Sequence, residues 1–222
     1  MGYPTVARII GPSLAEVSAF LASYRDLKPI AWDSAPEVHV KCPTSAVLEG
    51  LLGRFGDSVY SLDGSPLEVV VGAALVAAGF TVATAESCTG GLIGHLLTNV
   101  PGSSNYFLGG VVAYSNAAKA AMLGVPEDVL AAYGAVSREV VEAMAQGALR
   151  VFSASFGLAV SGIAGPSGGT PDKPVGTVWM AVAGEHGVQS RRLSLAGDRL
   201  HIKQATACHA LDMLRRAVLG LG

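Results

Sequence analysis

Beyond residue 65, short apolar segments rich in β-branched residues alternate with longer segments of helical periodicity. This alternation is typical of a layered α/β sheet, in which helices connect successive strands across its faces. The segments with strand character are 80–85, 109–114, 156–161, 176–183 and 188–194. The last two are joined by a short Gly-containing turn and should pair antiparallel. We therefore predict an α/β fold: a three-layer α/β/α sandwich with a mixed, mostly parallel sheet.

Capping signals set the expected ends of the helices, because short polar side chains can accept hydrogen bonds from free N–H groups at a helix start. Ser65 begins a capping-box pattern, and Asn116 is expected to cap a later helix. Ser137 should cap a long helix that ends near Phe152. The spacing on that helix places Val151 on its inner face.

Residues 1–64 have the pattern of a small α+β unit, with the predicted order β-α-β-β-α-β. Ser13 and Glu16 are typical of a capping box at its first helix, and 29–32 is predicted as a strand. A unit of this size has a thin core and should pack against its neighbour. We predict two domains, 1–64 and 65–222.

The low charge content excludes several classes of function. The formal net charge is −2, and no basic cluster exceeds a pair, so direct nucleic-acid binding is not expected. No apolar stretch is long enough to span a membrane. The 3 cysteines and 5 histidines lie scattered along the chain, which argues against a disulfide framework or a metal site. We expect a cytoplasmic protein that uses no metal and no cofactor.

Loops with polar residues and glycine follow three predicted strands, and ligands of open α/β sheets bind beyond the carboxyl ends of strands. These loops are 86–91, 114–119 and 161–169. In the first loop a strand passes through a turn into a helix, which should leave free backbone N–H groups beside the positive end of a helix dipole. A hydroxyl there, on Ser87 or Thr89, can reach a ligand, and an anion is favoured beside it.

Ser87 is a candidate nucleophile, but a serine hydroxyl needs a base at neutral pH. Lys119 lies five residues after Tyr114, one helical turn into the next predicted helix. A lysine shielded from water loses basicity and can accept the serine proton. Tyr114 can relay that proton or protonate a leaving group. The alternative is that Ser87 is only a helix cap and Lys119 a surface lysine, because one sequence does not show that the two loops meet.

Cys88 and His95 form a competing nucleophile–base pair. They lie 7 residues apart at the start of a helix, or roughly 10 Å along its axis. That distance is too long for direct proton transfer.

The third loop has the glycines and serines of a phosphate cradle, since small residues let the backbone wrap around an anion. The alternative is a mobile surface turn. Arg199 can reach a phosphate or can pair with an acidic residue at the surface.

Several motifs occur in the order seen in one protein family. They are Ala85-Glu-Ser-Cys-Thr-Gly-Gly91, Gly110-Val-Val-Ala-Tyr-Ser-Asn116 with Lys119, Gly134-Ala-Val-Ser137, Ser161-Gly-Ile-Ala-Gly-Pro166 with Gly168-Gly169, Lys173-Pro-Val-Gly-Thr177 and Gly197-Asp-Arg199. Residues 65–219 thus resemble the CinA C-terminal domain, which also occurs as the stand-alone nicotinamide-nucleotide amidase, PncC. The preceding residues resemble the KH-like connecting segment of full-length CinA proteins.

The resemblance implies hydrolysis of the carboxamide of nicotinamide mononucleotide to nicotinic acid mononucleotide and ammonia, in a homodimer and without a metal. It implies catalytic roles for Ser87, Tyr114 and Lys119. The substrate-binding positions that it implies are Glu86, Thr89, Gly90, Gly91, Asn116, Ser161, Gly162, Gly165, Gly168, Gly169 and Arg199. Ser161 stands where many members have Thr, which keeps the hydroxyl.

The alternative function is a non-catalytic CinA-type module that binds a nucleotide or dimerises, in connection with DNA uptake or the damage response. Retention of Ser87, Tyr114 and Lys119 together favours the enzyme, since a docking module does not need all three.

Overall fold

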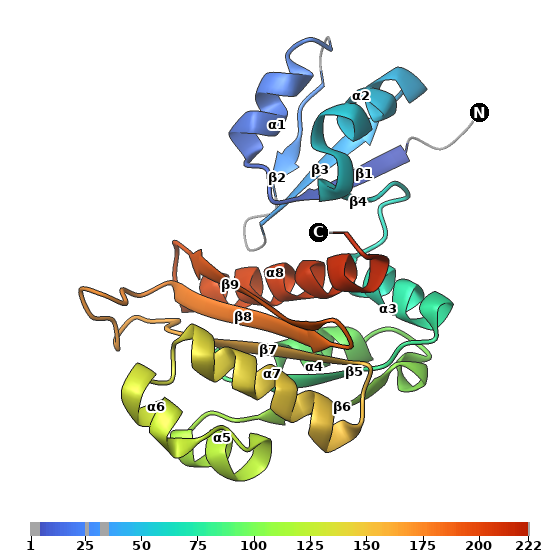
Figure 1. The fold of residues 1–222 in the computed structure, drawn as a ribbon. Helices are drawn as coiled ribbons and strands as arrows, with labels where there is room; N and C mark the ends of the chain where they lie inside the picture. Colours follow the sequence, from blue (N-terminus) through green and yellow to red (C-terminus); the bar gives the residue numbers. More distant parts are fainter. Residues whose placement is uncertain (1–4, 25–26, 32–35, 222) are drawn as a thin grey trace.

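The computed structural model describes residues 5–24, 27–31 and 36–221. It contains two sheets, each with its own helices, and these form the two units in Figure 1. The connection between the last strand of the smaller sheet, which ends at Ser61, and the helix that begins at Leu67 links the units.

The smaller sheet is antiparallel and has the strand order β2-β3-β1-β4. Its strands are β1 (Thr5–Ile10), β2 (Ile30–Ala31), β3 (Glu37–Cys42) and β4 (Val59–Ser61). Its helices are α1 (Leu14–Leu21), α2 (Ser45–Phe55) and the 3-10 turn η1 (Gly56–Ser58). The capping box predicted at Ser13 is present, because Ser13 and Glu16 each accept a hydrogen bond from the other's backbone N–H. The element order is as predicted, although Trp32 of one predicted strand lies outside the described residues.

The larger sheet has five strands in the order β6-β5-β7-β8-β9. These are β5 (Val82–Glu86), β6 (Phe107–Val112), β7 (Phe156–Gly162), β8 (Thr177–Gly184) and β9 (Gly187–Ser194). The β5–β6 and β5–β7 pairs are parallel, whereas β7–β8 and β8–β9 are antiparallel. The sheet is therefore mixed and mostly parallel, as predicted, because β6, β5, β7 and β9 run in one direction and β8, between β7 and β9, runs in the opposite direction.

Helices cover both faces of this sheet (Figure 1). They are α3 (Leu67–Ala78), α4 (Leu92–Thr98), η2 (Ser103–Asn105), α5 (Asn116–Leu123), α6 (Glu127–Tyr133), α7 (Arg138–Phe152) and α8 (Arg199–Leu219). Residues alternate between the two faces along β5: Val82 packs with α3, α4 and α8, whereas Ala83 and Ala85 pack with α5, α6 and α7. One strand thus contributes to two hydrophobic cores.

Two predicted caps and one predicted core residue are wrong. Pro66 is the N-cap of α3 and no side chain caps it, so Ser65 does not form a capping box. The cap of α5 is Ser115, whose hydroxyl accepts from Ala118 N, rather than Asn116. Val151 is 55% exposed although it follows the spacing of the buried stripe, because it lies in the last turn of α7, beyond the last buried residue, Ala148. The cap predicted for α7, Ser137, is confirmed.

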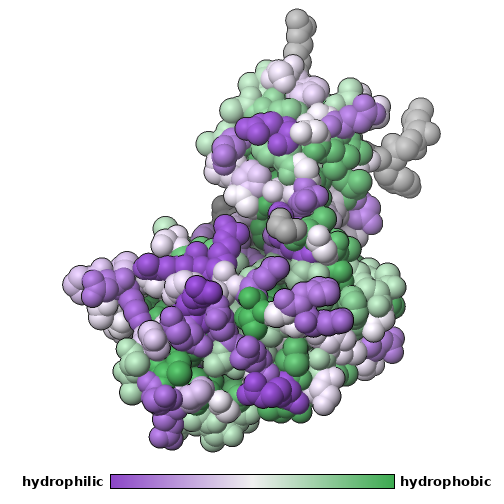
Figure 2. Space-filling view, in the orientation of Figure 1, coloured by the Kyte–Doolittle hydropathy of each residue, from purple (hydrophilic) through white to green (hydrophobic). Residues whose placement is uncertain are grey.

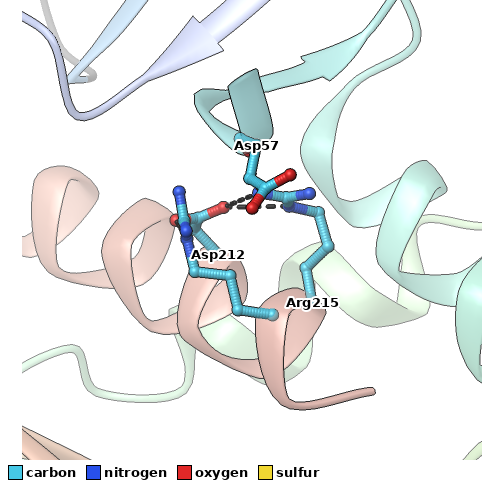
Figure 3. Close-up of polar contacts among 4 residues, drawn as sticks. Asp57, Asp212 and Arg215 are labelled. Atoms are coloured by element: carbon cyan, nitrogen blue, oxygen red, sulfur yellow. Dashed lines mark hydrogen bonds and ion pairs between the residues drawn. The ribbon is translucent and has the colours of Figure 1, made fainter. Parts of the chain in front are cut away.

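A buried arginine joins the two units (Figure 3). The Nη2 of Arg215, near the end of α8, donates to the backbone oxygen of Asp57 in η1 at 2.6 Å. Asp212, one turn earlier on α8, accepts from Arg215 at 2.8 Å and from Arg216 at 2.9 Å. Ile10 and Tyr60 of the smaller unit also join the hydrophobic cluster of α3 and α8. The smaller unit therefore packs on the larger one, as its thin core requires.

The space-filling view in Figure 2 shows the two units as lobes, with hydrophilic side chains gathered over the part of the larger lobe where β9 lies in Figure 1. Within the described residues, no helix combines the length and apolar character that crossing a membrane requires.

Candidate active site

The N–H groups at the start of α4, which follows the turn after β5, have hydrogen-bond partners that the sequence analysis did not predict. The carboxylate of Glu86, the last residue of β5, accepts hydrogen bonds from the N–H groups of Gly91, Ile93 and Gly94 at 2.8–3.1 Å. It also accepts from the Thr89 hydroxyl at 2.7 Å. The prediction that these helix N–H groups are free for a ligand is wrong, because a side chain of the protein itself already supplies the anion.

Ser87 and Lys119 meet in the folded chain. The Nζ of Lys119, on α5, lies 3.0 Å from Ser87 Oγ and donates a second hydrogen bond to Ala113 O at 2.8 Å. Lys119 is 1% exposed and Ser87 8% exposed. The backbone keeps the two loops in register, since Ala113 N donates to Glu86 O at 2.8 Å. The alternative of an ordinary surface lysine is therefore excluded.

Burial lowers the pKa of the Lys119 ammonium, because the charged form loses its hydration. No ion pair with Lys119 occurs in the described part of the chain to offset this effect. A larger fraction of Lys119 is therefore neutral near physiological pH than of an exposed lysine. A neutral amine 3.0 Å from a hydroxyl can accept its proton.

The competing thiol pair does not form. Burial raises the pKa of the Cys88 thiol to about 12, so the reactive thiolate is scarce at neutral pH. No hydrogen bond joins Cys88 to His95 in the described residues, and the His95 ring contacts Asn99 instead. The geometry favours the serine over the cysteine as nucleophile.

A cavity of about 340 Å³ opens beside Ser87 and Lys119. The predicted site residues that line it are Ser87, Tyr114, Lys119, Ser161, Gly162, Gly165, Gly168 and Arg199. The predicted site residues outside its lining are Glu86, Thr89, Gly90, Gly91, Asn116 and Gly169. Loops after β5, β6 and β7 thus converge on one cavity, as expected from the carboxyl ends of adjacent parallel strands.

Arg199, the first residue of α8, connects two walls of this cavity. Its Nη1 donates to Gly165 O at 2.8 Å, and its Nη2 donates to the Tyr114 hydroxyl at 2.9 Å. Because that hydroxyl accepts from Arg199, its own proton stays free to donate to a ligand. Arg199 also places a permanent positive charge in the lining of the cavity.

Sequence reasoning assigned no role to Ala135 and Val136, which form an apolar part of the lining. The Ser161 hydroxyl fixes this segment by donating to Ala135 O at 2.7 Å. The Ser137 hydroxyl, besides capping α7, donates to Gly134 O at 2.9 Å. The Gly134-Ala-Val-Ser137 motif is the sequence feature that could have identified this part of the site, since Ala135 and Val136 line the cavity.

The cavity carries no cluster of metal ligands. Among the described residues, no group of three or more His, Cys, Asp or Glu side chains is arranged to hold a metal ion. The functional groups in the lining of the cavity include the Ser87 hydroxyl, the buried Lys119 amine, the Tyr114 phenol and the Arg199 guanidinium.

The profile of one family, described as the CinA C-terminal domain, matches residues 64–218. The chain belongs to this family. A CinA-like protein of Geotalea uraniireducens is 44% identical over 97% of this chain and 55% of its own length. One of Fervidobacterium nodosum is 47% identical over 82% of this chain and 45% of its own length. The chain spans about half the length of these curated CinA relatives.

Solved structures agree with the family assignment. The competence/damage inducible protein CihA of Agrobacterium tumefaciens is 43% identical, with a TM-score of 0.67 over 69% of this chain and 93% of its own. The competence damage-inducible protein A of Klebsiella pneumoniae is 35% identical, with a TM-score of 0.68 over 70% of this chain and 97% of its own. The resemblance of residues 1–64 to a KH-like segment stays a prediction.

Proposed function

We propose that this CinA-family chain hydrolyses the carboxamide of nicotinamide mononucleotide to nicotinic acid mononucleotide and ammonia. The observation that carries the proposal is the 3.0 Å contact between Lys119 Nζ and Ser87 Oγ at the wall of a ligand-sized cavity. A serine hydroxyl in contact with a buried lysine suits acyl transfer from an amide. The choice of pyridine nucleotide rests on the family resemblance of the surrounding motifs.

In this mechanism Ser87 Oγ attacks the carboxamide carbon, and neutral Lys119 takes the hydroxyl proton. The proton then passes to the leaving nitrogen, and the tetrahedral adduct collapses to an ester on Ser87 and ammonia. Tyr114 donates a hydrogen bond to the reacting group. Water then attacks the ester while Lys119 again accepts a proton, which restores Ser87 and releases the carboxylate.

Two groups stabilise charge on the substrate. The N–H group of Cys88, a residue in the lining of the cavity, donates to no protein oxygen within the described residues and suits a developing oxyanion. Arg199, with donors left over from Gly165 and Tyr114, suits the phosphate of the nucleotide. Binding that phosphate supplies energy remote from the reacting carbon.

The test is ammonia release from nicotinamide mononucleotide by the wild type and by Ser87→Ala, measured side by side. We expect release by the wild type and none by the variant, with an unchanged circular dichroism spectrum. Equal release by both proteins would contradict the serine mechanism.

A second candidate is a non-catalytic binding module linked to competence or the damage response, the two processes that appear in the names of solved relatives. Absence of ammonia release from the wild type, together with calorimetric binding of the nucleotide, would favour it. Analytical ultracentrifugation would test the homodimer that we propose on the same family resemblance.

A further inference from the structure

Glu86 is a buried carboxylate that directly precedes Ser87, and the mechanism above does not use it. It is 2% exposed, and no salt bridge to it occurs in the described part of the chain. A buried carboxylate without a cation needs full hydrogen bonding to be tolerated. The groups that donate hydrogen bonds to the Glu86 carboxylate therefore show how its burial is tolerated.

All of these partners belong to the turn and to the first turn of α4. One carboxylate oxygen accepts from Thr89 Oγ1 at 2.7 Å, Gly91 N at 3.0 Å and Ile93 N at 3.1 Å. The other oxygen accepts from Gly94 N at 2.8 Å. The side chain thus ties residues 89–94 back to the end of β5, with Ser87 and Cys88 inside the closed loop.

The backbone of Glu86 supports the other half of the pair. Its carbonyl accepts from Ala113 N at 2.8 Å, and Ala113 O accepts from Lys119 Nζ at 2.8 Å. Glu86 is therefore bonded, directly or through one residue, to the segments that hold both Ser87 and Lys119. Its side chain lies outside the lining of the cavity, so it does not touch a ligand there.

We propose that Glu86 is a positioning residue that holds the turn in the conformation that places Ser87 Oγ against Lys119 Nζ. This inference rests on the proposed function, since it explains the reactivity of the same serine. It replaces the sequence-based expectation that Glu86 and Thr89 bind substrate directly.

The test uses Glu86→Gln, which keeps the size of the side chain but replaces one accepting oxygen with an NH₂ that cannot accept. We expect kcat to fall about 100-fold, as a small misplacement of a reacting group does. KM should stay near the wild-type value, because no ligand contact is lost. Amide hydrogen exchange at Gly91, Ile93 and Gly94 should become faster, while the core strands remain protected.

Two threonine variants provide a graded test and its control. Thr89→Val removes one of the four donors to the carboxylate and should lower kcat about tenfold with little change in KM. Thr98→Val removes a hydroxyl that donates only to carbonyls of its own helix, at 2.8 and 3.0 Å, and should leave kcat near the wild-type value. If Glu86→Gln does not fold, the comparison of Thr89→Val with Thr98→Val tests the positioning role instead.

The outcomes separate this inference from the proposed function. Wild-type kcat and wild-type amide exchange in Glu86→Gln, or in Thr89→Val if the first variant does not fold, would overturn the positioning role. If the wild type releases no ammonia, the proposed amidase function is wrong. Amide hydrogen exchange at residues 91–94 in Glu86→Gln then tests by itself whether Glu86 holds the turn. A loss of substrate affinity with unchanged kcat in Glu86→Gln would also overturn the positioning role, since that result indicates that Glu86 contacts the ligand.

Discussion

Lys119 Nζ lies 3.0 Å from Ser87 Oγ, although the two residues are 32 positions apart in the sequence. The contact arises because β5 and β6 are neighbouring parallel strands, so the segments that follow them begin at the same edge of the sheet. Lys119 lies at the start of α5 and reaches back over Ala113 to the hydroxyl. The proton transfer that we propose depends on this one contact.

Replacement of Lys119 by arginine separates charge from basicity. Lys119→Arg keeps a cation that donates hydrogen bonds, but a guanidinium stays protonated and cannot act as a base. We expect ammonia release to fall by about 10²- to 10⁴-fold. In the wild type, burial lowers the pKa of Lys119, so the neutral base accumulates and kcat rises as pH increases through that lowered pKa.

The measurement is kcat for both proteins from pH 6 to about 10, within the range in which a lysine with a lowered pKa titrates. The rise should vanish in Lys119→Arg. A similar rise in both proteins would assign the titration to another group.

Cys88 should be dispensable for the reaction. Because burial raises the pKa of its thiol to about 12, we expect slow alkylation by iodoacetamide at pH 8. Cys88→Ala should keep most of the ammonia release of the wild type, apart from losses due to packing. Loss of turnover in a folded Cys88→Ala variant would return the thiol mechanism to consideration.

Arg199 should discriminate between substrates by their phosphate. Arg199→Ala loses a charged donor, and hydrogen bonds to charged groups contribute about 1.5–3 kcal/mol. We expect KM for nicotinamide mononucleotide to rise about 10- to 100-fold, with a much smaller change for the riboside that lacks phosphate. Equal effects on the two substrates would mean that Arg199 acts only by holding Tyr114 and Gly165.

Arg215 should matter for stability and not for chemistry. Arg215 is 3% exposed, and its guanidinium bonds both Asp212 and the Asp57 carbonyl, so Arg215→Met leaves an acceptor and part of a carboxylate without a partner. We expect a loss of about 2–4 kcal/mol in the free energy of unfolding. Urea titration measures it, and Arg216→Met, which alters a more exposed partner of Asp212, is the matched control. An equal loss in both variants would argue against the contact between the units.

The order of the larger unit's elements could be predicted from periodicity and capping, because strands buried on both faces and Ser137 leave local signals. The antiparallel direction of β8–β9 could be predicted from the short turn between them, and the parallel direction of β5, β6 and β7 from the helices that connect them. The position of β8 between β7 and β9 depends on long-range packing, which no local pattern encodes.

The candidate site shows a similar division. Spacing alone does not show whether Ser87 and Lys119 come together, whereas the parallel pairing of β5 and β6 brings them into contact. Glu86 and Thr89, to which the family resemblance assigns substrate binding, bond to each other and lie outside the lining of the cavity. A carboxylate at a strand end and a helix N-terminus both invite a partner, and only the fold reveals that they satisfy each other.

The last helix gives the molecule a mechanical property. Arg199 begins α8 in the lining of the cavity, and Arg215 on the same helix holds the smaller unit, about 24 Å away by helical rise. A continuous helix of this length resists bending, so a displacement of one end is carried to the other. If a ligand in the cavity shifts Arg199, we expect the shift to reach Asp57 and the smaller sheet, and a spectroscopic label on the smaller unit measures it.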